Sequence, residues 1–363
     1  MARCLIGCGS NRGRRREQID RAVELLRFMP GVSVRAVSHY RETAPVGGPA
    51  GQQAFLNGAC LIDTDLPPFK VLEILAAIEK TLHRERAERW AARTIDLDLL
   101  LYDDVVMDTP DLTIPHPRMA TRRFVLEPAA EIAGDLVFPP AACSVRDLLD
   151  NISKPHPLIA VVGVPGSGAT EVASVVADAV MGRPLHAPAA LPTADGGPRA
   201  SLARWRQTLA AWSAPLDRHH WNDEGVATIA DYWCDGLVAA AADDLDADEL
   251  DDLRAEADAV ASRSVMPCVV IMLVADSAVI EERIAFRSHR SRDHTNVFAD
   301  LTAAALVCDR GGDRVAPLLH LQERLLRRLR STGDRVPKAV ITIDASDLSQ
   351  AALESTAAVE AML

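Results

Sequence analysis

Two stretches with different patterns of apolar residues meet at a short segment, residues 151–157, that has no apolar periodicity of its own. Pro155 and Pro157 lie in this segment, and proline interrupts both helices and strands. With 363 residues, the chain is long enough for two domains that each have a core. The sequence therefore predicts a first domain at residues 1–150, a linker at 151–157 and a second domain at 158–363.

The first stretch alternates between short strands and amphipathic helices. Strand patterns cover residues 5–8, 32–41, 55–62 and 95–106, and helical spacing of apolar residues covers 16–28 and 67–82. In chain order this gives β-α-β-β-α-β, which is the order of a ferredoxin-like α+β sandwich. We therefore expect a ferredoxin-like N-terminal domain.

The second stretch opens with an apolar strand at residues 158–164 that runs into a glycine-rich turn. Two later strands, 269–274 and 339–343, alternate with helical patterns, and residues 185–200 have the Pro, Ala and Gly content of a loop. Strands that alternate with helices are typical of a parallel sheet. The second domain is expected to be a parallel α/β fold.

The charge and the cysteines exclude several kinds of protein. A net charge of −12 argues against general binding to nucleic acid or anionic membranes, although a local arginine cluster can still bind phosphate. No apolar run is long enough to span a membrane, and the N-terminus lacks a signal-peptide core. The seven cysteines are scattered without CxxC spacing, which favours buried free thiols over disulfides or zinc. These features predict a cytoplasmic protein.

Two aspartates mark a candidate metal site in the segment RTIDLDLLLY at residues 93–102. On a strand, Asp96 and Asp98 project from one face while Leu97 and Leu99 enter the core. Two like charges on neighbouring positions of one face repel, and Mg²⁺, which prefers one or two carboxylates plus phosphate oxygens, would remove that penalty. The alternative is an exposed strand edge with solvated acids.

Four arginines crowd the ten residues just before these aspartates: Arg84, Arg86, Arg89 and Arg93. Guanidinium groups offer paired donors to phosphate and stay charged at any relevant pH. Such a loop beside a strand with two aspartates is suited to clamp a triphosphate. The alternative is a solvated loop whose charges are satisfied by Glu85 and Glu88.

Further polar and aromatic side chains lie at constrained positions. Prolines on both sides of His116 hold the imidazole in a fixed direction. Phe55 and Asn57 share one face of a predicted strand, and Phe124 follows a pair of arginines. On these patterns alone, both phenylalanines can equally be ordinary core residues.

Taken together, these elements resemble the 6-hydroxymethyl-7,8-dihydropterin pyrophosphokinase family. The resemblance runs from Leu5 to about Val137, with order and spacing kept. Its motifs include GSNRG at 9–13, YRETAPVG at 40–47, FLN at 55–57, RTIDLD at 93–98, PHP at 115–117 and RRFVL at 122–126. It implies an enzyme of folate biosynthesis that transfers the β,γ-pyrophosphoryl unit of ATP to the hydroxymethyl oxygen of the pterin and releases AMP.

The resemblance also implies roles for individual residues. Phe55 and Phe124 would sandwich the pterin ring, while Asn57 and backbone groups near Thr43 and Val46 would bond its edge. Asp96 and Asp98 would hold two Mg²⁺ ions. With Arg84 and Arg93 these aspartates form the expected catalytic set. The remaining ATP-binding residues would be Glu79, Arg86, Trp90, His116 and Arg122.

One departure from the family pattern affects the arginine loop. His83 stands where a glycine is usual, and the loop is one residue shorter than in some relatives. These differences concern loop geometry and ATP affinity. Every expected metal and stacking position is kept, so the resemblance implies an active domain.

The second domain has a glycine-rich loop, GVPGSGAT at residues 163–170, between a strand and a helix. This is the context of a phosphate-binding P-loop, formed here by Gly163, Gly166, Ser167, Gly168, Ala169 and Thr170. In such loops a lysine reaches the β- and γ-phosphates. The residue at that position of this chain is Ala169.

The remaining segment resembles the deoxynucleoside kinase family of P-loop enzymes. The resemblance rests on LDRHHWND at 216–223, on residues 268–276 before Glu282, Arg283 and Ile284, and on a lid with Arg287, Arg290 and Arg292. The acidic general base of that family would fall within residues 187–190, where no acid is present. We therefore expect a degenerate, non-catalytic kinase-like domain that regulates the protein or assembles it as a homodimer.

Two other interpretations stay open from the sequence. The protein can be a bifunctional enzyme with an active deoxynucleoside kinase domain, which Ala169 argues against. It can also be a wholly non-catalytic nucleotide sensor or scaffold. Asp96, Asp98 and the arginines argue against that interpretation.

Overall fold

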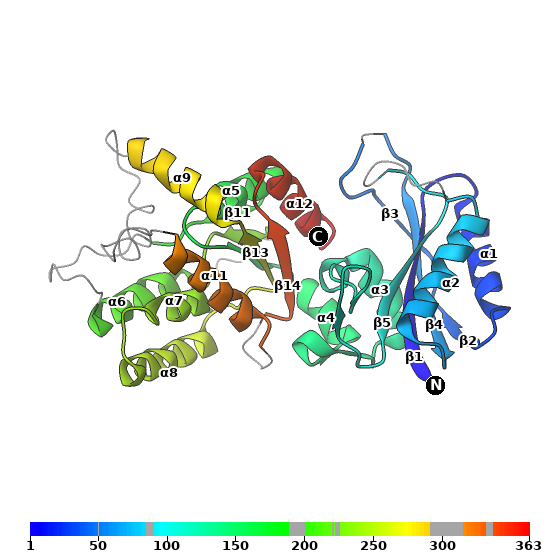
Figure 1. Ribbon diagram of the computed structural model, residues 1–363, viewed down its shortest axis with the longest axis horizontal. Helices are drawn as coiled ribbons and strands as arrows, with labels where there is room; N and C mark the ends of the chain where they lie inside the picture. Colours follow the sequence, from blue (N-terminus) through cyan, green and yellow to red (C-terminus); the bar gives the residue numbers. More distant parts are fainter. Residues whose placement is uncertain are drawn as a thin grey trace. The chain divides into compact units, whose positions relative to one another are not determined.

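The structure, a computed structural model, describes residues 1–49, 51–84, 91–188, 201–219, 221, 226–290, 315–331 and 337–363, with the side chains of 287–290 left out. These residues form two compact units. Unit 1 comprises Met1–Lys154 together with Ala357–Leu363, and unit 2 comprises Pro155–Thr356. Each unit is a mixed α/β structure (Figure 1).

Unit 1 is built on an antiparallel sheet with the strand order β2-β4-β1-β5, with β3 also paired to β4. The strands are β1 (Ala2–Ser10), β2 (Val32–Val37), β3 (Arg41–Thr43), β4 (Phe55–Thr64) and β5 (Asp96–Tyr102). The central strand β1 is mostly buried, as expected for a strand with neighbours on both sides and helices over it.

The single strand predicted at residues 32–41 is two strands, β2 and β3. The Ser38 N–H donates to Ala59 O at 3.0 Å, but the Ala59 N–H is accepted by the Ser38 hydroxyl at 2.9 Å, so a side chain replaces the backbone acceptor at this point of the ladder. The Tyr40 ring then covers Gly58, where a Cβ would lie 2.6 Å from Tyr40 Cδ1. The chain rejoins β4 three residues further on, with Arg41 opposite Asn57.

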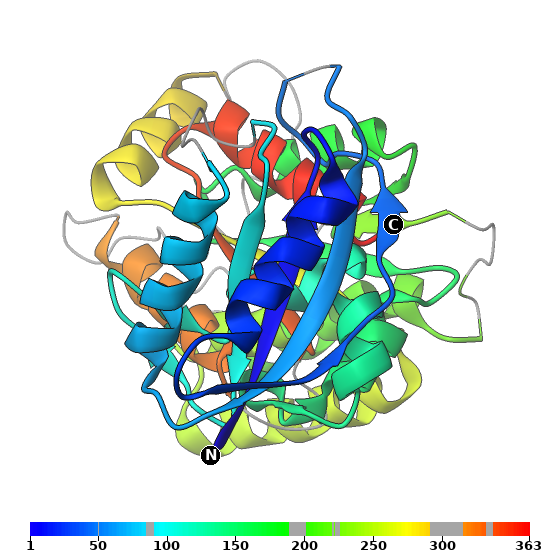
Figure 2. The same cartoon turned by 90° about the vertical axis from the view of Figure 1, so that its right-hand side faces the viewer.

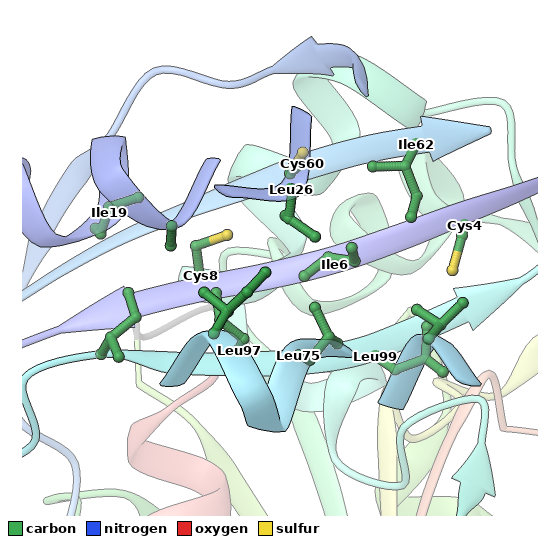
Figure 3. Close-up of a cluster of buried hydrophobic side chains, with 14 of the residues drawn as sticks. Cys4, Ile6, Cys8, Ile19, Leu26, Cys60, Ile62, Leu75, Leu97 and Leu99 are labelled. Atoms are coloured by element: carbon green, nitrogen blue, oxygen red, sulfur yellow. The ribbon is translucent and has the colours of Figure 1, made fainter. Parts of the chain in front are cut away.

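Helices α1 (Arg15–Arg27) and α2 (Pro68–Thr81) lie side by side across one face of this sheet (Figure 2). Their buried side chains meet those of the strands in the core of unit 1, which contains Ile6, Cys8, Ile19, Leu26, Cys60, Ile62, Leu75, Leu97 and Leu99 (Figure 3). Helix α3 (Arg123–Ala133) packs against the opposite face, next to β4. The face that carries Asp96 and Asp98 is therefore the one opposite α1 and α2.

Short elements complete unit 1. Hairpin β6 (Met107–Asp108) and β7 (Thr113–Ile114) follows β5, and the 3-10 turn η1 (Met119–Thr121) leads into α3. Hairpin β8 (Val137–Phe138) and β9 (Cys143–Ser144), with the turn η2 (Pro139–Ala141) between its strands, leads into α4 (Val145–Ile152). Ser144 caps α4 in a reciprocal arrangement with Asp147.

The predicted boundaries of the first domain differ from the structure at two places. Helix α4 extends to Ile152, whose side chain is buried, so the first part of the predicted linker is helical and belongs to unit 1. Residues 357–363, predicted to lie in the second domain, also belong to unit 1. A linear reading of the sequence cannot find such a return of the chain, because it depends on packing between distant residues.

Unit 2 contains a fully parallel sheet with the order β11-β12-β10-β13-β14, as the alternation of strands and helices predicted. The strands are β10 (Leu158–Val162), β11 (Arg183–Leu185), β12 (Thr228–Ala230), β13 (Val269–Val274) and β14 (Ala339–Asp344). Strand β10 is buried throughout. Such continuous apolar strands are characteristic of parallel sheets covered on both faces.

The helices of unit 2 are α5 (Ala169–Ala179), α6 (Leu202–Ser213), α7 (Cys234–Ala241), α8 (Ala247–Arg263), α9 (Ser277–Arg290), α11 (Ala316–Leu329) and α12 (Leu348–Glu360), with the turn η3 (Ala214–Leu216). The last turn of α12, from Ala357 on, is counted with unit 1. The apolar face of α11 packs with α7 on β10 and β13. Helix α5 packs against β10, β11 and β12. Among the described residues, no helix is both long and apolar enough to cross a membrane.

Candidate active site

Asp96 and Asp98 lie at one end of the unit 1 sheet, at the start of β5. Asp96 is paired with Gly9 and Asp98 with Gly7, both on the central strand β1. The intervening Leu97 is buried in the core with Leu99. Both carboxylates therefore project from the same face of the sheet.

Two arginines of the predicted clamp hold Asp96. Arg93 Nη1 lies 2.6 Å from Asp96 Oδ2, and Arg84 Nη1 lies 2.8 Å from Asp96 Oδ1. All three side chains are about three-quarters buried or more. Partial burial strengthens these pairs relative to those at the surface, and it places two positive charges beside the candidate metal position.

Glu79 faces inward instead of toward solvent. It is 8% exposed, and its Oε1 accepts the Leu97 N–H at 2.7 Å. The same carboxylate pairs with Arg84. Glu79 thus connects α2 to the backbone between the two aspartates and pairs with Arg84, which in turn contacts Asp96. The ATP contact that the family resemblance implies for Glu79 stays a prediction.

The environment of Asp98 disfavours its charged form. Burial raises the pKa of Asp98 to about 7, and the Asp96 carboxylate adds to the shift. Three guanidinium groups act in the opposite direction on this pKa, those of Arg122, Arg93 and Arg84. A carboxylate with this pKa gains from a cation placed beside it, because the cation stabilises the ionised form.

His116 is a neutral imidazole at physiological pH. Burial, followed by the charge of Arg122, lowers the pKa of His116 to about 4. Its Nδ1 accepts the Arg118 N–H at 3.2 Å, so the ring proton resides on Nε2. His116 N donates to Leu100 O at 2.9 Å, which fixes the histidine beside β5. The side chain can therefore donate a hydrogen bond without adding charge.

The predicted pterin-binding residues lie across β1 from Asp96. Asn57 on β4 is paired with Gly9, and its Nδ2 donates to Thr43 Oγ1 at 2.8 Å. A Cβ placed on Gly9 would lie 3.0 Å from Asn57 Oδ1 and 4.0 Å from Phe55 Cδ1, with Asp96 Cβ at 3.9 Å. Gly9 therefore keeps open the space between the Asn57 side and the Asp96 side of the sheet.

The other two predicted pterin contacts come from a loop and a helix. Val46 is half-buried in the segment after β3, and Phe124 is half-buried in the first turn of α3. The Arg122 guanidinium lies over the Phe124 ring, 5.6 Å from its centre. Phe55 and Phe124 do not belong to the buried cores of the unit.

Asn11 connects two loops of this site through hydrogen bonds, a role that the sequence patterns did not predict. It is 1% exposed, accepts the Arg93 N–H at 2.8 Å on Oδ1, and donates its own N–H to Arg93 O at 3.2 Å. Its Nδ2 donates to Gln52 Oε1 at 3.1 Å. Asn11 therefore joins the loop before β4 to the loop before β5. Its only sequence signal is its place in the family motif at residues 9–13.

His83 has a backbone φ of 58°, in the left-handed region. Glycine adopts this region without steric cost, whereas a side chain with a Cβ is disfavoured there. The glycine that the family resemblance implies at this position would adopt this conformation without strain. The conformation turns the chain directly before Arg84.

The donor set at this end of the sheet fits a magnesium ion that is shared with phosphate. Among the described residues, no group of three or more His, Cys, Asp or Glu side chains could hold a metal ion by itself. Asp96 and Asp98 together offer carboxylate oxygens on one face, and Mg²⁺ is commonly held by one or two carboxylates plus substrate phosphates. A metal bound here would therefore depend on the nucleotide for its remaining ligands.

Several predicted residues lie outside the described part of the chain. Among them are the expected ATP contacts Arg86 and Trp90, the positions 189–190, the side chains of Arg287 and Arg290, and Arg292.

The glycine-rich loop of unit 2 follows β10 and leads into α5. Gly166 and Gly168 have φ values of 89° and 88°, which only glycine adopts without strain. The Arg283 guanidinium donates to the Gly166 and Ser167 carbonyls at 3.3 Å, and to Ala345 O and Ser346 O at 2.6 and 3.0 Å. The loop carbonyls are thus held by an arginine from α9. Ala169 begins α5, and no lysine occupies its position.

A histidine–aspartate pair, His186 and Asp231, lies beside the start of segment 187–190, which contains no acid of its own. His186 Nδ1 lies 3.0 Å from Asp231 Oδ2, and Asp231 Oδ1 accepts the Ala187 N–H at 2.8 Å. The Asp231 side chain is 1% exposed and that of His186 is 48% exposed. These residues follow the neighbouring strands β11 and β12. An acid that lies 45 positions from His186 in the sequence therefore contacts the start of this segment.

Two carboxylates beside arginines and a neutral histidine, at one end of an antiparallel sheet, define unit 1 as an enzyme that transfers phosphate-containing groups. The family model for 7,8-dihydro-6-hydroxymethylpterin-pyrophosphokinase matches residues 5–134. The chain belongs to this pyrophosphokinase family.

Individual proteins of this family show how far the similarity extends. The 2-amino-4-hydroxy-6-hydroxymethyldihydropteridine pyrophosphokinase of Pseudomonas aeruginosa is 42% identical over 137 residues, which cover 38% of this chain and 84% of that protein. The protein of the same name from Bacillus subtilis is 47% identical over 127 residues, covering 35% of this chain and 75% of that protein.

A solved structure of deoxyadenosine kinase from M. mycoides, with products dCMP and dCDP bound, aligns with 55% of this chain and 95% of its own. The sequence identity is 12% and the TM-score is 0.37.

Proposed function

We propose that unit 1 transfers the β,γ-pyrophosphoryl unit of ATP to the hydroxymethyl oxygen of 6-hydroxymethyl-7,8-dihydropterin and releases AMP, a step of folate biosynthesis. The observation that carries this proposal is the register of three strands. Asn57, Gly9 and Asp96 lie opposite one another, so a pterin beside Asn57 and a triphosphate beside Asp96 would meet over a residue without a side chain. Family membership supports the same activity.

The protein groups act by positioning and by charge. Transfer between two bound substrates requires in-line alignment and neutralisation of phosphate charge more than covalent help from the enzyme. Arg84 and Arg93 place positive charge beside Asp96, and neutral His116 offers a hydrogen bond from Nε2. Asp96 and Asp98 would hold two Mg²⁺ ions, which when bound supply further positive charge to the phosphate oxygens.

The pterin would lie between Phe55 and Phe124. Both rings are half-buried, so a flat ligand gains stacking area without disturbing the core. Asn57 would bond the polar edge of the pterin, with its amide fixed by Thr43, and backbone groups near Thr43 and Val46 would complete that edge. The strand order β2-β4-β1-β5, with α1 and α2 on one face, supports a ferredoxin-like fold for this unit.

The test is an assay of AMP formation from Mg²⁺-ATP and reduced hydroxymethylpterin with the full chain. Asp98→Ala is expected to abolish transfer while thermal unfolding stays near that of the wild type, because one of two repelling acids has been removed. Phe124→Ala is expected to weaken pterin binding by about 1–3 kcal/mol, the scale of aromatic stacking on bases, with a much smaller effect on ATP. Near-normal turnover in Asp98→Ala would overturn the metal assignment.

For unit 2 we propose a kinase-like P-loop domain that binds a phosphate group without transferring it. Ligands of open parallel sheets bind outside the carboxyl ends of the strands, and the glycine-rich loop stands at that end of β10, before the N-terminus of α5. Arg283 holds the loop carbonyls, which supports a preformed cradle of N–H groups. Ala169 cannot supply the charge that stabilises transfer. Self-association through this unit stays a prediction.

A bifunctional enzyme is the second candidate, and the His186–Asp231 pair is the observation in its favour. A buried carboxylate that holds one imidazole nitrogen leaves the other nitrogen available as a proton acceptor. The two candidates differ in one assay, formation of ADP and deoxynucleoside monophosphates from Mg²⁺-ATP and each deoxynucleoside. We expect no product from the wild type. Robust product that is lost in His186→Ala would establish the bifunctional alternative.

A further inference from the structure

The first turn of α3 in unit 1 is held by residues from the far end of the sequence. The Arg123 N–H donates to Ala361 O at 2.8 Å, and Arg123 Nε donates to Met362 O at 2.9 Å across a sequence separation of 239 positions. Both carbonyls belong to segment 357–363, which is part of unit 1.

One of these bonds satisfies a backbone N–H group at the start of α3. The first N–H groups of a helix have no partner within it, and α3 has no side-chain cap at its N-terminus. Ala361 O supplies the partner for the Arg123 N–H. The guanidinium also donates to Ile152 O at 3.2 Å and to Ser153 Oγ at 3.3 Å, so Arg123 joins the helix to the end of α4 as well.

Segment 357–363 is packed rather than loosely attached. Val359 is 2% exposed, Ala361 6% and Met362 0%. Burial of these apolar side chains fixes the two carbonyls that Arg123 binds, because a buried backbone cannot move freely without leaving polar groups unpaired.

The residues on both sides of Arg123 are those of the proposed active site. Arg122 immediately precedes α3, and its charge acts on both Asp98 and His116. Phe124, the proposed pterin platform, is the second residue of the helix. Arg122 is joined directly to Arg123, and Phe124 follows it within the helix, where successive residues differ in direction by about 100°. Anchoring Arg123 therefore holds the backbone from which both neighbouring side chains extend.

We infer that Arg123 and segment 357–363 are positioning elements of the pyrophosphokinase site, which hold the first turn of α3 so that Arg122 and Phe124 face their ligands. This inference rests on the function proposed for unit 1. In this arrangement Arg123 and segment 357–363 act through Arg122 and Phe124.

The experiment compares four forms of the full protein: the wild type, Arg123→Ala, a chain that ends at Thr356, and Arg146→Ala as a matched control. Arg146 Nη2 donates to Ala130 O at 2.7 Å, so it also binds an α3 carbonyl, but at the end of the helix remote from the site. We expect Arg123→Ala and the shortened chain to lose about tenfold or more in kcat/KM, since small displacements of positioning groups have effects of this order.

Arg146→Ala is expected to lower the Tm by a similar amount while kcat/KM stays at the wild-type value. Arg123→Lys, which keeps one donor, should recover part of the loss. If all variants lose activity only in proportion to their stability, or if Arg123→Ala keeps the wild-type kcat/KM and KM values, the positioning role is wrong.

Hydrogen exchange supplies a readout that is independent of turnover. Amides 123–126 should exchange faster in Arg123→Ala and in the shortened chain, while amides 129–133 stay protected. Unchanged exchange of amides 123–126 would overturn the inference even if the activity fell. Conversely, a wild type that forms no AMP from Mg²⁺-ATP in the presence of the pterin would refute the proposed function, whereas the exchange result would still report on the anchoring of α3.

Discussion

Asn57 and Asp96 are both paired with Gly9, one from each side of the central strand of unit 1. The Cα atoms of the residue proposed to bind the pterin and of a residue proposed to bind the metal are therefore two strand spacings apart, about 10 Å. Gly9 leaves the space between them free, and its backbone is not in the left-handed region. A glycine is therefore required at position 9 by the small space next to the Asn57 side chain and not by the backbone conformation.

Gly9→Ala is expected to weaken pterin binding about fivefold, which corresponds to about 1 kcal/mol. The new methyl group would lie 3.0 Å from Asn57 Oδ1 and force the amide to move. Gly7→Ala on the same strand is the control, because its Cβ would be in ordinary contact with Leu100 at 3.4 Å. The measurement is pterin affinity by calorimetry, together with Tm. Equal losses in both variants would show that the effect is general to the strand.

Magnesium binding with a non-hydrolysable ATP analogue is expected to depend on pH through Asp98. With a pKa of about 7, Asp98 is largely protonated at pH 6 and must release its proton when the cation binds. Apparent affinity should fall as pH decreases from 8 to 6, by up to about tenfold per pH unit. Calorimetry in two buffers of different ionisation enthalpy measures the proton release. Asp98→Asn should abolish the release, and a wild type that releases no proton at pH 6 would contradict the assignment.

The stability of the metal-free protein should show two opposing effects of pH. Asp98, with its pKa raised from 3.8 to about 7, keeps a proton that the unfolded chain loses, so its contribution falls as pH rises between these values. His116, with its pKa lowered from 6.5 to about 4, rejects a proton that the unfolded chain binds, so its contribution falls as pH decreases over that window. Each limiting slope is about 1.4 kcal/mol per pH unit.

The two slopes largely cancel between pH 4 and 6.5 in the wild type, and single substitutions should reveal them. Relative to the wild type, Asp98→Asn should become more stable with rising pH in this window, and His116→Gln less stable. Denaturant unfolding at several pH values measures both. Parallel pH profiles for the two variants would contradict the assigned pKa shifts.

Glu79→Ala is expected to destabilise unit 1 by about 1–3 kcal/mol, because it leaves the buried Leu97 N–H without its acceptor. Glu79→Gln should cost less, since the amide oxygen can still accept that bond, but it removes the charge that pairs with Arg84. Both variants should raise the KM for ATP through Arg84. Thermal unfolding and steady-state kinetics test this, and an unchanged KM for ATP in Glu79→Gln would separate Glu79 from the nucleotide site.

Local patterns of the sequence determined much of unit 1. The period of two in residues 95–102 places Asp96 and Asp98 on one face and Leu97 and Leu99 in the core, and the structure has that arrangement. The parallel sheet of unit 2 followed from alternating strands and helices. These features depend on neighbouring residues, for which the spacing of side chains directly gives the face on which they lie.

The tertiary structure alone decided which distant residues meet. Glu79 lies 18 positions from Leu97, His186 lies 45 from Asp231, and Arg123 lies 239 from Met362. No periodicity connects such pairs, because each hydrogen bond forms only after helices and strands have packed and excluded water from the groups involved. The sequence by itself therefore determined the faces of the elements and the family. Only the folded chain decided which residues bind Glu79, His186 and the first turn of α3.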